Sequence, residues 1–457
     1  MSAPPELVSL RDTLWRSRRL ASRRLWGAQA SVALADMASG TALGDAAPAL
    51  ADRSVLLRVA DPLHAALALI ELDGVARRIV LCPPDLSDGA LAGVIETTAI
   101  DTMASDLAPS PATAGLDLVR IALPVRPLAA APHAMRATEW VMFTSGTSGP
   151  PKLVVHTLAG LTGAIKPAAA DAEPPVWATF YDIRRYGGLQ MLLRALTGEG
   201  SMVVGSPAEP VAAFLARAAA HGATHITGTP SHWRRALMTP EAAALAPRYV
   251  RLSGEIADQG VLDALQARFP GVPVGHAYAS TEAGVGFEVN DGLAGFPADF
   301  VGRSGEVEIE VADGALRLRS ARAAAGYLGG GAVADAAGFV DTGDMVERRG
   351  DRYHFVGRRG GVINVGGLKA HPEEIEAVIN RHPDVSASRA CGRRNPITGA
   401  IVVAEVVLKP GAGEARVRAE ILQSCRAELA PFKVPTMLKF VPALAITAGG
   451  KLERAVA

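Results

Sequence analysis

Residues 140–156 run Trp-Val-Met-Phe-Thr-Ser-Gly-Thr-Ser-Gly-Pro-Pro-Lys-Leu-Val-Val-His. An apolar segment is followed by four hydroxyls and two glycines within six positions, then by a lysine and a β-branched segment, which predicts a strand, a loop and a strand. Such a loop gathers backbone N–H groups, hydroxyls and one cation in a small space, as a polyphosphate requires. The predicted phosphate-binding residues are Thr144, Ser145, Gly146, Thr147, Ser148, Gly149 and Lys152.

This loop differs from the Walker loop of many phosphotransferases. Leu153 follows Lys152, where a Walker loop has Ser or Thr, and a strand pattern follows where a Walker loop opens a helix. A Walker-type phosphotransferase is therefore disfavoured. By composition alone the segment is also typical of an ordinary solvated loop. The order Thr-Ser-Gly-Thr-Ser-Gly-Pro-Pro-Lys decides between them, because it resembles the phosphate loop of the adenylate-forming superfamily, which contains acyl-CoA synthetases, peptide-synthetase adenylation domains and luciferases.

The composition is that of a globular protein with two or three domains. The chain has 457 residues, 49% of them hydrophobic, and a net charge of zero. A neutral chain gives no electrostatic argument for nucleic acid or an anionic membrane. Three widely separated cysteines indicate a reducing, cytoplasmic location, and no apolar segment is long enough to cross a bilayer. The arginines between Arg16 and Arg24 predict an amphipathic surface helix rather than a targeting signal.

Short apolar segments alternate with helical patterns through the first two thirds of the chain, which predicts an α/β fold with parallel sheets. The predicted strands of this part are 54–59, 78–82, 201–204, 224–227, 249–252 and 274–278, and the predicted helices are 63–72, 210–221 and 259–269. Three of these strands end in polar or glycine-containing loops. Ligands bind beyond the carboxyl ends of parallel strands, so these loops are expected to meet the 144–152 loop at one crevice.

The remainder predicts two smaller units. Short strands with hairpin turns between 299 and 357 indicate a small antiparallel unit, and a helix–strand–helix–strand pattern after 361 indicates an α+β C-terminal domain. The predicted division is an N-terminal domain of 1–357 with subdomains of about 1–135, 136–298 and 299–357, a hinge at 358–361, and a mobile C-terminal domain of 362–457. The first subdomain is shorter than in the resembled family.

The resemblance extends from Trp140 to Arg454 through five motifs in the family's order, and it is nearest to acyl-CoA synthetases. In the second motif, His276 to Glu282, the resemblance implies that Tyr278 faces adenine and that Thr281 contacts the α-phosphate or the carboxylate. Glu282 would hold Mg²⁺ between the phosphates. Ala279 replaces the family's glycine and is expected to crowd the acyl entrance. We interpret His276 as a core histidine.

The other motifs complete the implied nucleotide site. Ser253-Gly254-Glu255 matches the adenine-side loop, and Asp344 of Thr-Gly-Asp would accept hydrogen bonds from the ribose hydroxyls. Arg358 would add a contact to ribose or phosphate. Lys451, in the Gly449-Gly450-Lys451 motif, would bridge the attacking carboxylate and the α-phosphate, whereas without the other motifs it would be a solvated tail charge.

The resemblance implies a two-step ligase. A carboxylate attacks MgATP to give acyl-AMP and pyrophosphate; the C-terminal domain then rotates, and a segment with Gly366, Gly367 and Lys369 is presented so that a thiol can attack the adenylate. The expected cofactors are ATP, Mg²⁺ and CoA or phosphopantetheine. One alternative is an acyl-AMP ligase that loads an acyl carrier protein or an amine; another is a non-catalytic nucleotide-binding relative. A homodimer is left open.

The predicted hinge of this chain departs from the pattern of its relatives. Gly360-Gly361 stands where relatives usually carry an aspartate pair, which leads to the hypothesis of a looser hinge; a solvated turn without consequence is the alternative.

By the resemblance, residues 181–190 line the acyl pocket, and Tyr186-Gly187-Gly188-Leu189 favours an apolar acyl tail. Arg184 and Arg185 are interpreted as surface charges, with an inward, diacid-binding arrangement as the alternative.

Overall fold

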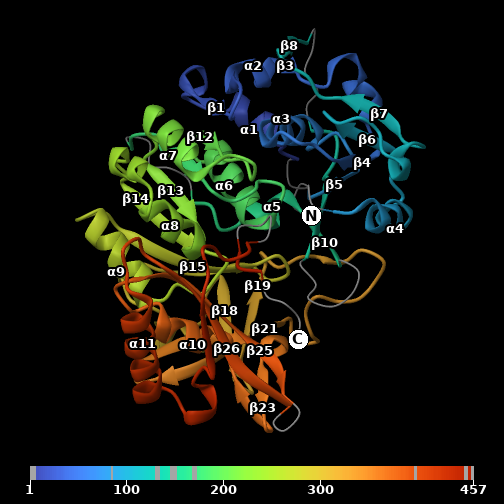
Figure 1. The fold of residues 1–457 in the computed structure, drawn as a ribbon. Helices are drawn as coiled ribbons and strands as arrows, with labels where there is room; N and C mark the ends of the chain where they lie inside the picture. The colour runs from blue at the N-terminus through green and yellow to red at the C-terminus, as the bar shows by residue number, and fades with distance from the viewer. Residues whose placement is uncertain are drawn as a thin grey trace.

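The computed structural model describes residues 7–83, 86–128, 134–144, 152–166, 172–395, 399–446 and 451–453 (Figure 1). The larger of its two main sheets is built, within these residues, from β1 (Arg24–Trp26), β2 (Ser31–Ala33), β11 (Val176–Thr179), β12 (Ser201–Val204), β13 (His225–Gly228), β14 (Tyr249–Ser253), β15 (Val274–Ser280) and β16 (Gly284–Val289). Its order is β16-β15-β14-β13-β11-β12-β1-β2. The strands from β1 to β15 are parallel, and the two edge strands are antiparallel to their neighbours.

A second sheet forms the other side of the N-terminal domain. Its described strands are β4 (Ser54–Leu57), β5 (Arg78–Leu81), β6 (Thr102–Ser105), β7 (Asp117–Arg120), β9 (Glu139–Phe143), β10 (Leu153–His156) and β20 (Gly326–Tyr327), in the order β20-β10-β9-β5-β4-β6-β7. Strands β9 and β10 pair antiparallel, with Phe143 opposite Leu153, so the predicted strand–loop–strand arrangement is confirmed around the loop.

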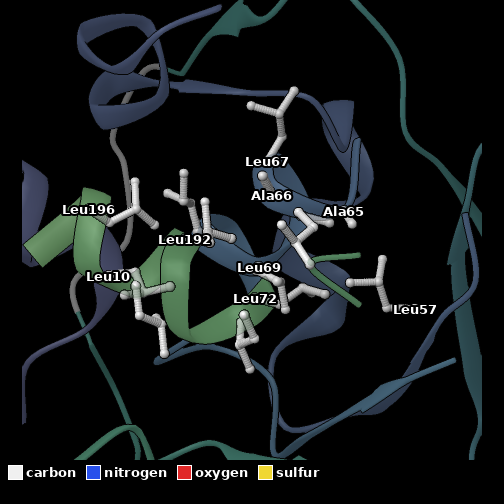
Figure 2. Close-up of a cluster of buried hydrophobic side chains, with 14 of the residues drawn as sticks. Leu10, Leu57, Ala65, Ala66, Leu67, Leu69, Leu72, Leu192 and Leu196 are labelled. Carbon is white, nitrogen blue, oxygen red and sulfur yellow. The ribbon is translucent and has the colours of Figure 1, made fainter. Parts of the chain in front are cut away.

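Two helices, α3 (Pro62–Leu72) and α6 (Tyr186–Thr197), pack with both sheets into one hydrophobic core. Figure 2 shows leucines of α3 beside Leu192 and Leu196 of α6 and Leu10 of α1 (Leu10–Trp15), all of them buried. A fully buried leucine contributes about 1.5–3 kcal/mol. This core therefore fixes the position of α6, whose N-terminal end reaches the candidate site.

Further helices connect or cover the strands. They are α2 (Leu34–Ser39), α4 (Asp88–Thr98), α5 (Leu158–Thr162), α7 (Val211–Ala220), α8 (Pro230–Leu237) and α9 (Gln259–Arg268). Helix α8 begins with a capping box, in which Thr229 and His232 bond each other's backbone N–H groups, and Pro230 occupies the first turn. This local chemistry ends β13 and starts α8 at the edge where β14 and β15 also end.

The rest of the chain forms two antiparallel units. The first contains β17 (Phe296–Pro297), β18 (Val307–Ala312), β19 (Ala315–Ser320), β21 (Val340–Arg349) and β22 (Arg352–Arg358). The C-terminal unit contains β23 (Ile363–Val365), β24 (Leu368–Ala370), β25 (Val385–Asn395), β26 (Gly399–Leu408), β27 (Met437–Phe440), α10 (Pro372–Ile379) and α11 (Glu414–Glu428). It packs α10 against β22 and β25 against α8, below the large sheet in Figure 1. The predicted fold class is confirmed.

The predicted arginine-rich surface helix at the N-terminus is wrong. Helix α1 ends at Trp15, and Arg23, only 2% exposed, directs its guanidinium at the end of α6. Its nitrogens donate to the carbonyl oxygens of Ala195, Leu196 and Gly200 at 2.6–2.9 Å. The last carbonyls of a helix lack intrahelical partners, so a buried guanidinium is retained here as their donor.

Candidate active site

The parallel strands β13, β14 and β15 are neighbours and end at one edge of the large sheet, and we call the region beyond their ends the crevice. Gly254 follows β14 with a left-handed φ of +85°. A Cβ placed on it would lie 3.7 Å from Cγ2 of Thr229, which follows β13. The Tyr181 hydroxyl donates to the carbonyl oxygen of Ser253 at 2.9 Å, which joins the segment before α6 to the end of β14.

Lys451 lies in this crevice. Its Cε is 3.5 Å from the Cβ position on Gly254. Although its side chain is exposed to the crevice, the surrounding protein displaces water and lowers the pKa of Lys451. The carboxylates of Glu255 and Asp344 oppose this shift in pKa, and the guanidinium groups of Arg358 and Arg185 reinforce it. The ammonium is thus surrounded by charges of both signs from three parts of the N-terminal domain.

The tail that carries Lys451 is anchored by Glu255. The Leu452 N–H donates to Glu255 Oε1 at 3.0 Å. The same carboxylate accepts from the backbone N–H and the hydroxyl of Ser231 at 2.9 and 3.1 Å. On the other side the tail is tied to the C-terminal unit, since Arg389 donates to the Glu453 carbonyl oxygen at 2.8 Å. Glu255, assigned to the adenine side from the sequence, therefore links the two domains here.

The residues assigned to adenine and ribose are adjacent. The Tyr278 hydroxyl donates to one oxygen of Asp344, and Arg358 Nε donates to the other at 2.8 Å. The Tyr278 ring stacks on Phe287 and Phe355 with centroids 5.6 and 5.3 Å apart. Burial, followed by the nearby Asp344 carboxylate, raises the pKa of Tyr278, so its hydroxyl remains a proton donor.

The two ends of the predicted phosphate loop, Thr144 and Lys152, are joined by a backbone hydrogen bond. The Thr144 N–H donates to the Lys152 carbonyl oxygen at 3.0 Å, and the Lys152 ammonium lies 5.2 Å from the centroid of the Tyr327 ring on β20. The contact resembles a cation–π interaction. The other predicted phosphate-binding residues, Ser145, Gly146, Thr147, Ser148 and Gly149, lie outside the described residues.

Glu282 directly follows Thr281. Its charge influences both the Tyr327 hydroxyl beside Lys152 and the Arg358 guanidinium, so the carboxylate is near both groups. No three His, Cys, Asp or Glu side chains gather closely enough to hold a metal ion within the described ranges. A single carboxylate still fits Mg²⁺, because this ion is usually held by one or two carboxylates together with substrate phosphates.

Thr281 is positioned through its backbone. His156, on β10, is 1% exposed, and its Nε2 lies 2.7 Å from the Thr281 carbonyl oxygen. Burial lowers the pKa of His156, so the neutral ring donates from Nε2. Ala279 sits at a β-bulge and packs against the main core. His276 is 8% exposed, which agrees with its interpretation as a core histidine.

The segment proposed for the second step lies away from the crevice. Gly366 and Gly367, with φ of +60° and +87°, make the turn between β23 and β24, and Lys369 is exposed. Figure 1 shows β23 at the end of the C-terminal unit farthest from β10. At the predicted hinge, apart from the two chain neighbours of Gly360, no heavy atom of the described residues lies within 4 Å of a Cβ built on it, and its φ is not left-handed.

The interpretation of Arg184 as a surface charge is wrong. Arg184 is 3% exposed; it pairs with Asp182 at 2.7 and 3.0 Å and donates to the Val59 carbonyl oxygen at 2.6 Å. Arg185, interpreted in the same way, is half-buried near Lys451. Sequence reasoning did not name His232, which stacks on Phe180 with centroids 5.3 Å apart. Burial lowers the pKa of His232 to about 3, so its ring is neutral.

Among the described residues, no helix is both long enough and apolar enough to cross a membrane. The chain is 29% identical over 342 residues to a sulfoacetate–CoA ligase of Cupriavidus necator, with 70% of this chain and 66% of the relative covered. It is 30% identical to an oxalate–CoA ligase of Arabidopsis thaliana, with 69% and 66% covered. Each match thus spans just under two thirds of the relative's length.

Its fold is similar to that of a benzoate–CoA ligase from Burkholderia xenovorans, with a TM-score of 0.80, 21% identity, and 98% of this chain and 99% of the other covered. The sequence model described as AMP-binding enzyme matches residues 74–328, more than half of the chain. The model described as AMP-binding enzyme C-terminal domain matches residues 374–451. The chain therefore belongs to the AMP-binding enzymes, the adenylate-forming superfamily in which acyl-CoA synthetases are found.

Proposed function

We propose that this protein is an AMP-forming acid–CoA ligase that activates a small carboxylic acid with MgATP. The observation that carries the proposal is the position of Lys451, which enters the crevice at Gly254 on a tail anchored by Glu255. A cation delivered to strand ends from a separate domain suits a reaction in which negative charge develops at a phosphate. The matched relatives, which include two CoA ligases, support the same reaction class.

In the first step a carboxylate oxygen attacks the α-phosphorus of ATP, the bond to the bridging oxygen breaks, and pyrophosphate leaves. Lys451 stabilises the developing charge, the 144–152 loop holds the β- and γ-phosphates, and Asp344 with Arg358 orients the ribose. Glu282 would hold Mg²⁺, which neutralises phosphate charge when it is bound. Because Lys451 already occupies the crevice, the described arrangement suits this step.

In the second step the thiol sulfur attacks the acyl carbonyl carbon, the thiol loses its proton, and AMP leaves. For this the tail must withdraw and the β23–β24 turn must approach the crevice, which requires the C-terminal unit to rotate at residues 358–361. We assign the thiol to CoA. A carrier-protein phosphopantetheine presents the same thiol arm, and its use, like an amine acceptor, is an outcome that the assay distinguishes.

The test is pyrophosphate release with MgATP over a panel of acids, each with and without CoA. Acid-dependent release whose turnover rises with CoA supports the ligase. Acid-dependent release that CoA leaves unchanged points instead to a carrier-protein or amine acceptor. A folded protein that binds ATP and releases no pyrophosphate with any acid would favour a non-catalytic nucleotide-binding relative.

The Lys451→Ala variant tests the assignment of the tail. Removing one donor to a developing oxyanion typically costs about 10²- to 10³-fold in rate. We expect that loss in acyl-AMP formation, while supplied acyl-AMP is still converted to the thioester. Lys451→Arg, which retains a cation, serves as the matched control. An equal loss in both steps for Lys451→Ala would contradict the two-state role.

A further inference from the structure

A cluster of buried and half-buried charged groups lies behind the crevice, on the face of the large sheet that α6 covers. Arg251, on β14, is 4% exposed, and its Nη1 lies 3.4 Å from Glu288 Oε2 on β16. The Tyr249 hydroxyl donates to the other oxygen of Glu288. Arg194, on α6, lies near both Arg251 and Glu288, whose charges act on it in opposite directions. Sequence reasoning named neither arginine.

The cluster has more positive charge than its own partners neutralise. Two guanidinium groups, those of Arg194 and Arg251, lie beside one carboxylate, that of Glu288. The Tyr249 hydroxyl is neutral because burial raises its pKa. Burial and then the neighbouring Arg251 lower the pKa of Arg194 to about 10, which leaves it charged at neutral pH. Among the described residues, Nε of Arg194 and Nε of Arg251 are both buried without a hydrogen-bond acceptor. A cation that is partly removed from water and lacks a matching anion is costly, and an anionic ligand would reduce that cost.

The position of Arg251 connects this cluster with the reaction site. In a parallel sheet, Arg251 and Ser253 point to the same face, because side chains alternate along a strand. Tyr181 bridges the two ends, since its hydroxyl bonds Ser253 and is influenced by the charges of both Arg251 and Glu255. Gly254 follows Arg251 by three residue steps along the chain, which corresponds to about 10 Å in extended backbone.

We propose that the acid substrate carries a second anionic group, a carboxylate or a sulfonate, bound between Arg194 and Arg251. This inference rests on the proposed function, because it concerns the acid that the ligase activates. The first carboxylate would lie near Lys451 and the second anionic group between the two arginines, so the two are separated by several bonds. It replaces the apolar acyl tail favoured from the sequence. The relatives named for sulfoacetate and oxalate also act on acids with two anionic groups.

Oxalate is expected to be a poor substrate for this chain, because its adjacent carboxylates cannot reach both ends. The assay compares kcat/KM for pyrophosphate release with acids that differ in one group: succinate and butanoate, adipate and hexanoate, 4-sulfobutanoate and pentanoate, terephthalate and 4-methylbenzoate. A hydrogen-bonded charged pair is worth about 1.5–3 kcal/mol, so the best dianionic acid should exceed its methyl counterpart by roughly 10- to 150-fold. The sulfonate pair distinguishes a sulfonate subsite from a carboxylate subsite.

Two variants test the assignment to the arginines. Arg251→Met and Arg194→Met should remove the preference for the dianionic member of the best pair and retain activity with its methyl counterpart. Arg251→Lys and Arg194→Lys should keep part of the preference, which a purely structural role would not predict. If a Met variant does not fold, the comparison of acid pairs on the wild-type enzyme still decides.

The outcomes separate the two proposals. Robust release with monoanionic acids and none of the expected preference would overturn the second-anion site while the ligase assignment stands. A preference that persists in both folded Met variants would also overturn it. Absence of release with every acid, from a protein that binds ATP, would instead contradict the ligase assignment itself.

Discussion

Glu255 should control whether the tail occupies the crevice. Within the described residues, Glu255 accepts a 3.0 Å hydrogen bond from the Leu452 N–H, which joins the two domains, and two from Ser231, which lie within the N-terminal domain. A hydrogen bond to a charged group contributes about 1.5–3 kcal/mol. Glu255→Ala therefore weakens docking of the tail by roughly 10- to 150-fold at 1.4 kcal/mol per factor of ten.

The assay measures acyl-AMP formation and thioester formation separately, the second with supplied acyl-AMP. We expect Glu255→Ala to slow acyl-AMP formation by up to the factor given above and to leave thioester formation nearly unchanged, because the tail is withdrawn in that step. Ser231→Ala is the matched control, since it removes the 3.1 Å hydroxyl bond to Glu255 and keeps the contact with Leu452.

The reasoning is refuted if both steps slow equally in a Glu255→Ala protein with the wild-type melting temperature, or if Ser231→Ala slows acyl-AMP formation as much as Glu255→Ala does. Either result would assign Glu255 to the structure of the α8 segment or to nucleotide contact, and not to docking of the tail.

Three further predictions follow from features of the site and fold. The pKa of Lys451 is lowered, so the protonated form that we propose for acyl-AMP formation is lost as pH rises. The rate should therefore fall with a midpoint below 10.5, and Lys451→Arg should move that midpoint upward in a pH–rate profile. Arg23→Met should lower the free energy of unfolding by about 3–5 kcal/mol, measured by denaturant titration, because buried carbonyl oxygens lose their donor. The control, Arg24→Met, changes a half-buried side chain and should lower it by less than about 1 kcal/mol. Gly360→Asp should leave the melting temperature unchanged, since no neighbour lies within 4 Å, and slow the alternation between the two steps; unchanged rates of both steps would reject the hinge hypothesis.

Sequence periodicity predicts the layered architecture well because its parallel strands are short, mostly apolar and buried along most of their length. The strand 201–204 has the predicted bounds, and α9 ends one residue before its predicted end. The meeting of strand ends was also predictable, because parallel strands place their carboxyl ends at one edge. The convergence of Gly254 with Lys451 agrees with this reasoning, while the roles of the individual site residues stay predictions.

The buried arginines were not predictable from a single sequence. Arg23, Arg184 and Arg251 are each less than 5% exposed, yet arginine is usually a surface residue. What retains Arg23 and Arg184 inside is a set of acceptors brought near only by folding, such as the carbonyls at the end of α6. The contact between Glu255 and Leu452 likewise joins positions 197 apart, which no local pattern indicates.

Strand β20 decides where a fragment that contains the predicted phosphate loop and its supporting strands can end. Although it lies between β19 and β21 of the small antiparallel unit in sequence, it pairs with β10, Val154 opposite Tyr327. A fragment that stops before Gly326 would leave β10 as an open sheet edge, available to pair with other chains and prone to aggregate. It would also remove the ring beneath Lys152. A nucleotide-binding fragment for expression should therefore extend through Tyr327.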